Sequence, residues 1–116
     1  MAKVVNKFAQ QKAVNAPAIL IGDMNANPDS QAYATLTSYW NDGNSNAWGT
    51  LSGSSTNYHY SVTAMSDGRN DRRIDHILTK GCEASAYQRT VITYEVDEND
   101  WCPSDHLPIT AKVAIP

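Results

Sequence analysis

The chain has 116 residues, of which 41% are hydrophobic, and a formal net charge of −3 at neutral pH. This length allows one domain at most, and the composition is that of a globular protein and not of a disordered segment. The acidic balance, with an isoelectric point of about 5.4, argues against a broadly basic surface for nucleic acids. No stretch approaches the roughly 18 apolar residues of a membrane-spanning helix, and residues 1–10 lack the apolar core of a signal peptide.

The first part of the chain predicts two helices with a strand between them. Lys3–Val14 has apolar side chains at helical spacing among good helix formers. Ala18–Ile21 is a short, continuous apolar run, which is typical of a strand covered on both faces. A turn is predicted at Gly22–Pro28, and a second helix at Ser30–Tyr39, which begins after side chains that can cap it.

The second part predicts strands separated by polar segments. Asn41–Asn57 is rich in Gly, Ser and Asn and is expected to be a long loop, a kind of segment that is more often functional than not. Four stretches have the composition or the alternation of strands: Tyr58–Thr63, Arg73–Thr79, Gln88–Val96 and Ile109–Ile115. We therefore expect an α/β fold, with one mixed or antiparallel sheet and both helices on one face of it.

Three short polar clusters lie where apolar runs meet turns. They are Gly22-Asp23-Met24-Asn25, Arg73-Ile74-Asp75-His76-Ile77 and Ser104-Asp105-His106-Leu107-Pro108. Carboxylates, an amide and an imidazole at strand ends are the groups needed to hold a divalent metal and to activate water against a phosphoester. By themselves, Asp23–Asn25 is at least as typical of a structural turn and Ser104–Pro108 could be a capped turn, whereas the alternative for Asp75, a solvated strand carboxylate, is weaker. The functional interpretation therefore depends on the combination of the three clusters.

The residue types divide the chemistry among the clusters. Asp23 and Asn25 are two apart, so in extended backbone both side chains leave the same face, where the carboxylate can orient water and the amide can donate to a phosphoryl oxygen. A catalytic imidazole needs a carboxylate on its other nitrogen, and Asp75 is the expected partner of His106. Asp105 has the oxygen ligands that a hard cation prefers.

In this order, the three clusters closely resemble the C-terminal half of the endonuclease/exonuclease/phosphatase superfamily, which has the DNase I-like fold. Asn27-Pro28-Asp29 before a helix and the pair Gly49-Thr50 agree with this resemblance. It extends from about Ala18 to Ile115, nearly the whole chain. It implies that residues 1–116 are a single incomplete domain, half of a β-sandwich built from two similar sheets.

The resemblance also implies metal-dependent phosphoester hydrolysis. Asp23 and Asn25 would position the attacking water and stabilise the transition state. Asp75 would orient His106, and Asp105 would contribute to a site for Mg²⁺ or Mn²⁺. The substrate stays open among nucleic acids, nucleotides and lipid head groups.

Three further residues have less defined roles. Arg72 is expected to face a substrate phosphate. Trp48 either stacks on a base or sugar or anchors its own loop. His76 replaces an aromatic residue that is common in the family, and we interpret it as a packing residue and not as a metal ligand.

The first half of the family's domain carries a metal-binding Glu that has no candidate in this sequence. We therefore expect the chain to be inactive alone and to bind metal weakly. Strands built for a sandwich would expose one apolar sheet face, which a second copy or the missing N-terminal half would cover. The alternative function is a catalytically silent fragment that serves as a dimerisation or interaction module.

Overall fold

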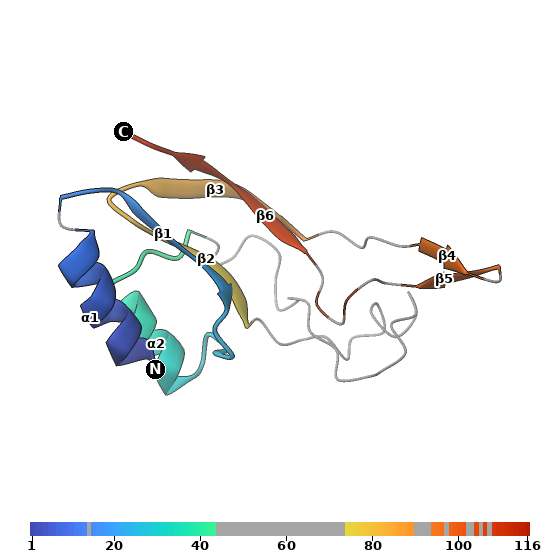
Figure 1. The fold of residues 1–116 in the computed structure, drawn as a ribbon, viewed down its shortest axis with the longest axis horizontal. Coiled ribbons are helices and arrows are strands. Elements are labelled where there is room, and N and C mark those ends of the chain that lie inside the picture. The colour runs from blue at the N-terminus through green and yellow to red at the C-terminus, as the bar shows by residue number, and fades with distance from the viewer. Residues whose placement is uncertain are drawn as a thin grey trace.

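The computed structural model describes residues 1–13, 15–43, 74–89, 94–96, 98–101, 104, 106 and 108–116. Their secondary structure, in chain order, is α1 (Ala2–Lys12), β1 (Ala18–Asp23), α2 (Gln31–Thr37), β2 (Asp75–Lys80), β3 (Glu83–Arg89), β4 (Tyr94–Val96), β5 (Asn99–Trp101) and β6 (Ile109–Ala114) (Figure 1). In this part of the chain, none of the helices has the length and apolar character needed to cross a membrane. The predicted α/β class is confirmed, while the strand expected at Tyr58–Thr63 lies outside the described residues.

The described strands pair in antiparallel ladders of two strands each. β1 pairs with β2, β3 with β6 and β4 with β5. The single sheet expected from the sequence is thus divided, although β3 follows directly after β2 in the chain. A side chain links these two strands, because the Tyr87 hydroxyl donates to the Ile77 carbonyl oxygen at 3.0 Å.

Strand β3 differs from its prediction. We expected a strand at Gln88–Val96, whereas β3 begins at Glu83 and ends at Arg89, with β4 following from Tyr94. The pairing of β3 with β6 shifts register between Ser85 and Gln88, and Ala86 there has a φ of 50°. This bulge breaks the period-two alternation on which the prediction relied, so the first half of the strand was missed.

Both helices cover the same face of the β1–β2 ladder, as predicted (Figure 1). The buried core that they form with β2 consists of Ala9, Leu36, Trp40 and Leu78. Asn6 of α1 fastens the two helices together. Its side-chain amide donates to the Thr35 carbonyl oxygen at 2.7 Å and accepts from the Trp40 indole N–H at 3.0 Å.

Strand β1 is covered on one face only. Ala18 and Leu20 pack against the core beneath the helices, whereas Ile19 and Ile21 on the other face are 41% and 67% exposed. The expectation that β1 is covered on both faces was wrong, because an apolar run does not reveal whether a second layer is present. The exposed apolar face is confined to β1, because Ile77 and Thr79, which lie opposite Ile21 and Ile19 on β2, are buried.

Candidate active site

Three of the predicted catalytic residues meet at one end of the β1–β2 ladder. Asp23 ends β1 and lies directly opposite Asp75, which begins β2, so both side chains leave the same face. The chain returns to this point 31 residues after Asp75 and places His106 against the pair. The Nδ1 atom of His106 lies 2.7 Å from Asp75 Oδ2, and its Nε2 atom lies 3.8 Å from Asp23 Oδ2.

The charges of the two carboxylates and the imidazole explain why these three side chains lie together. Two carboxylates directly opposite each other on paired strands destabilise the ladder, and an imidazole in contact with both relieves their repulsion when it is protonated. A carboxylate can only accept, so the Nδ1–H of His106 donates to Asp75. The Asp75 side chain is 15% exposed and the Asp23 side chain is 48% exposed. The Nδ1 atom of the ring therefore contacts the more buried carboxylate, and the Nε2 atom faces the more exposed one.

The turn after β1 holds Asp23 in place. The backbone N–H of Asn25 donates to Asp23 Oδ1 at 2.8 Å, and Asn25 has a φ of 47°, in the left-handed region that Asn tolerates. The backbone here is not extended, so the expectation based on strand alternation does not apply to this pair. The structural-turn interpretation is confirmed for Asp23 Oδ1, while Oδ2 is left facing His106, as the site interpretation requires.

The third polar cluster is described at Ser104, His106 and Pro108. The backbone N–H of His106 donates to the Ser104 hydroxyl at 3.0 Å, which forms the turn ahead of β6. Asp105, Arg72 and Trp48 lie outside the described residues.

His76 lies on the opposite face of β2 from Asp75, and it is 2% exposed. Its Nε2–H donates to the Ala26 carbonyl oxygen at 2.7 Å, and its ring packs against Tyr33 with centroids 5.3 Å apart. This placement agrees with the interpretation of His76 as a packing residue. The bond to Ala26 was not anticipated, although strand alternation already indicated that His76 points away from Asp75.

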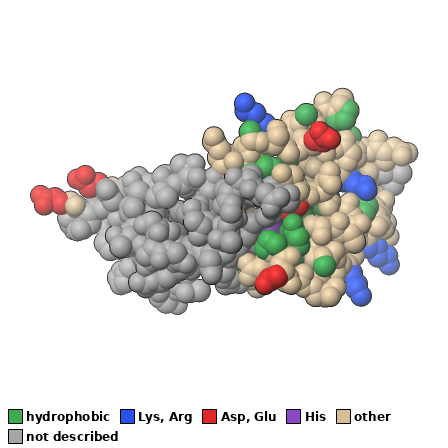
Figure 2. All heavy atoms as spheres, turned by 180° about the vertical axis from the view of Figure 1, so that it is seen from behind, with side chains coloured by type: hydrophobic (Ala, Val, Ile, Leu, Met, Phe, Trp, Pro, Cys, Tyr) green, Lys and Arg blue, Asp and Glu red, His purple; other side chains and the backbone are tan. Residues whose placement is uncertain are grey.

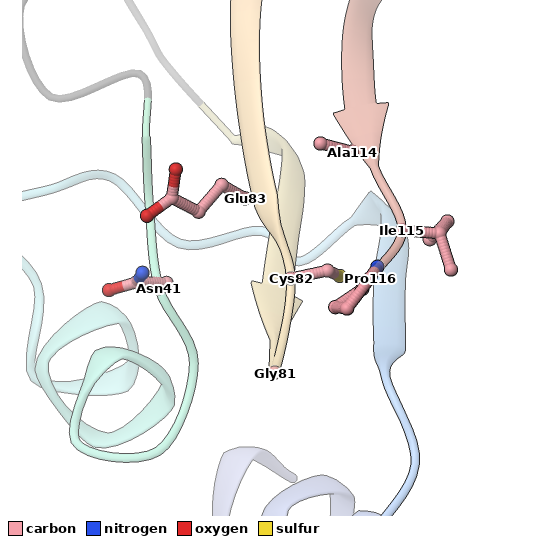
Figure 3. Close-up of a pocket in the computed structure, with 7 residues that line it drawn as sticks. All are labelled: Asn41, Gly81, Cys82, Glu83, Ala114, Ile115 and Pro116. Atoms are coloured by element: carbon pink, nitrogen blue, oxygen red, sulfur yellow. The ribbon is translucent and has the colours of Figure 1, made fainter.

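A hollow of about 510 Å³ lies at the other end of β2. The residues that line it are Asn41, Gly81, Cys82, Glu83, Ala114, Ile115 and Pro116 (Figure 3). Gly81 is six positions beyond Asp75, which corresponds to about 20 Å along an extended strand. The described lining contains one carboxylate and no imidazole, so we assign no catalytic chemistry to this hollow.

The cluster is partly exposed, since the side chains of Asp23 and His106 are 48% and 31% exposed. Seen from behind, hydrophobic side chains lie next to a histidine and an acidic side chain (Figure 2). Ile21, which precedes Asp23 by two residues and shares its face of β1, is among the exposed apolar residues. The candidate site therefore borders the uncovered sheet face.

Two solved structures have a similar fold. A mannosyl-6-phosphatase from Bacteroides thetaiotaomicron superposes with a TM-score of 0.76 at 24% identity over 98% of this chain, and a conserved protein of unknown function from Enterococcus faecalis with 0.69 at 22% identity, also over 98%. The alignments cover only 44% and 42% of those two proteins, so this chain spans less than half of their length. These likenesses show the fold, which is that of a partial DNase I-like domain.

Sequence comparison identifies the family directly. No protein of curated function matches the chain significantly. Residues 3–106, which include the first two polar clusters and the third as far as His106, match the family described as Endonuclease/Exonuclease/phosphatase. The chain therefore belongs to the endonuclease/exonuclease/phosphatase family.

Proposed function

We propose that this chain carries the C-terminal half of the catalytic machinery of a metal-dependent phosphoester hydrolase. The observation that supports it best is the contact of His106 with Asp75 at 2.7 Å, with Asp23 3.8 Å from the other ring nitrogen. An oriented imidazole next to a second, more exposed carboxylate is the pairing that general acid–base chemistry needs.

Each residue then has a role that follows from its position. Asp75 holds the His106 ring, whose Nε2–H donates to a phosphoryl oxygen as negative charge builds during attack. Asp23 orients the attacking water and accepts its proton. The side-chain amide of Asn25, which is exposed on the turn, donates to a second phosphoryl oxygen.

The donor set fits a hard divalent cation. Asp23 offers an exposed carboxylate oxygen, and ligand atoms of Asp23, Asp75 and His106 lie within 4.8 Å of one another. Since Asp75 and His106 already bond to each other, we assign Mg²⁺ or Mn²⁺ to Asp105, the ligand that the family resemblance implies. Such a metal supplies Lewis-acid stabilisation of phosphoryl charge.

The substrate is a phosphoester whose alcohol part this half of the domain does not select. Nucleic acids, nucleotides and lipid head groups stay as candidates, and the likeness to a mannosyl-6-phosphatase adds sugar phosphates. The net charge of −3 disfavours tight nonspecific binding of nucleic acid.

The exposed side chains of Ile19 and Ile21 need a covering layer. We assign that face either to the N-terminal half of a family domain or to a second copy of this chain. The whole-domain activity depends on the first of these two, because the expected metal-binding Glu belongs to the N-terminal half.

The test compares the chain alone with a fusion to the N-terminal half of a family member. We expect little or no turnover of p-nitrophenyl phosphate, mannose 6-phosphate or a generic phosphodiester by the isolated chain with Mg²⁺ or Mn²⁺. The fusion should be active, and His106→Ala should lower its kcat by about 10²- to 10⁴-fold, as expected for loss of a general acid–base group. Lys112→Ala, an exposed change on β6, serves as the control.

The outcomes separate the two candidate functions. Strong turnover by the isolated chain would overturn the half-domain proposal. A folded fusion without activity on any of these esters would favour the silent interaction module, which the uncovered apolar face also supports.

A further inference from the structure

Two contacts, one from the residue before strand β2 and one from β2 itself, hold the turn that carries Asp23 and Asn25. The backbone N–H of Met24 donates to the Ile74 carbonyl oxygen at 2.8 Å. Two residues further along both segments, the imidazole of His76 donates to the Ala26 carbonyl oxygen at 2.7 Å. The turn is thus fastened by the residues on either side of Asp75.

The His76 contact is built to be rigid. His76 is 2% exposed and the Ala26 residue that it binds is fully buried. The ring of Tyr33 packs against the imidazole, with the ring centroids 5.3 Å apart. A buried hydrogen bond of this kind is costly to leave unmade, so it strongly favours one position of the turn.

Strand alternation gives β2 two functions at adjacent residues. Asp75 points to one face and orients His106, while His76 points to the other and holds Ala26. The position of His106 and the position of the Asp23–Asn25 turn therefore both depend on two adjacent residues of β2. A misplacement of about 1 Å at such a site can cost about 100-fold in rate, so this common reference matters for catalysis.

We propose that His76 is a positioning residue: its Nε2–H bond to the Ala26 carbonyl sets the Asp23–Asn25 turn relative to Asp75 and His106, and thereby the approach of Asp23 to the His106 ring. Its consequence for catalysis rests on the proposed hydrolase function. The positioning itself is measurable in the folded 116-residue chain without any turnover, so the two proposals fail independently.

The test uses two substitutions of His76, one that keeps an aromatic ring and one that keeps an N–H donor. His76→Phe keeps an aromatic ring against Tyr33 but has no donor, whereas His76→Gln places an N–H donor near the Nε2 position without the ring. By NMR, His76→Phe should lose the nuclear Overhauser effect between the Asp23 β-protons and the His106 ring. Amide exchange at Met24 and Asn25 should accelerate about tenfold, as for loss of one hydrogen bond.

Two further results distinguish a positioning role of His76 from a general contribution to stability: rescue by His76→Gln, and a change in amide exchange that is limited to the turn. His76→Gln should restore the Asp23–His106 contact and slow exchange at the turn. The control is Tyr33→Phe, which removes the nearby bond to Asp42 but retains the ring, and it should leave the turn unchanged. Exchange in α1 should be the same in all variants.

Three results would overturn the proposal. The first is an unchanged Asp23–His106 contact and unchanged turn exchange in His76→Phe, and the second is acceleration that is uniform across α1, α2 and the turn. The third result comes from the wild-type chain, so this test can be made even if His76→Phe does not fold. A ring-nitrogen spectrum of the wild-type chain should show the proton of His76 on Nε2, and a proton on Nδ1 alone would exclude donation to Ala26.

Discussion

The cross-strand pair of Asp23 and Asp75 is the residue-scale feature that makes this end of the ladder unusual. Like charges directly opposite each other are unfavourable unless a cation or a proton donor lies between them. His106 supplies that donor, at 2.7 Å from one carboxylate and 3.8 Å from the other. The local electrostatics therefore favour a protonated imidazole, which is the form that the proposed mechanism requires.

We expect the pKa of the His106 imidazole to lie above its ordinary value of about 6.5, because the Asp75 carboxylate stabilises the charged ring. Asp75→Asn should lower this pKa, and Asp23→Asn should lower it less, since Asp23 is more distant and more exposed. NMR titration of the ring measures both, with the exposed Asp29→Asn as the control. Equal values in wild type and Asp75→Asn would remove the pair from the mechanism.

The contact between His106 and Asp75 also determines how the free energy of unfolding should change with pH. A group with a raised pKa in the folded state contributes stability that is fully present below its unfolded pKa, here about pH 6.5. That contribution is lost as the pH rises through the higher folded pKa of His106. Urea unfolding at several pH values should therefore show a decline in wild type that is smaller in Asp75→Asn. An identical pH dependence in the two proteins would contradict the linkage.

At the scale of elements, the start of α2 connects the site to the core. Ser30 has extended backbone, and its hydroxyl oxygen accepts from the Tyr33 backbone N–H at 3.1 Å, which caps the helix. The same hydroxyl donates to the Asn27 carbonyl oxygen at 2.7 Å. Ser30 thus ties the end of the site turn to the first turn of α2, which carries Tyr33 against His76.

Ser30→Ala should lower the free energy of unfolding by about 1 kcal/mol, the usual cost of losing a side-chain N-cap. Ser38→Ala at the other end of α2 is the matched control, since the Ser38 hydroxyl is exposed and donates only within its own helix. Chemical denaturation of both variants measures the difference. Equal stabilities for the two would show that the cap does not stabilise α2.

At the scale of the whole molecule, the dominant feature is the uncovered face of β1. Ile19 and Ile21 stand beside the catalytic cluster on the same face of the ladder, opposite to the helices. Full burial of an Ile side chain contributes about 1.5–3 kcal/mol, so this face favours association with another apolar layer. In the isolated chain, the available layer is a second copy.

We expect the isolated chain to self-associate through this face, with a Kd that rises at least tenfold in Ile21→Ser, because each copy loses the burial of one Ile. Light scattering over a concentration series measures the change. Val4→Ser, at a position 71% exposed on α1, is the control and should leave association unchanged. A wild-type chain that stays monomeric at millimolar concentration would refute the prediction.

Several properties of this protein follow from its sequence alone, because they depend on residues close together in the chain. The α/β class, the helix that starts after Ser30 and the apolar strand before Asp23 all come from local spacing and local capping. The order of the three polar clusters was enough to indicate the family, which the match over residues 3–106 establishes. The contact between Asp75 and His106, which are 31 residues apart, is an exception: it was expected because a catalytic imidazole requires an orienting carboxylate and because the family resemblance implies this pair.

Other properties were decided only by the tertiary structure, because they depend on contacts between segments far apart in sequence. The antiparallel register places Asp23 opposite Asp75, and no local pattern specifies that pairing. The first part of β3 lacks the alternation of apolar and polar residues that predicts a strand, because the bulge near Ala86 departs from the period-two geometry. Whether Ile21 is covered depends on which second layer packs on the sheet, and an apolar strand has the same sequence in either case.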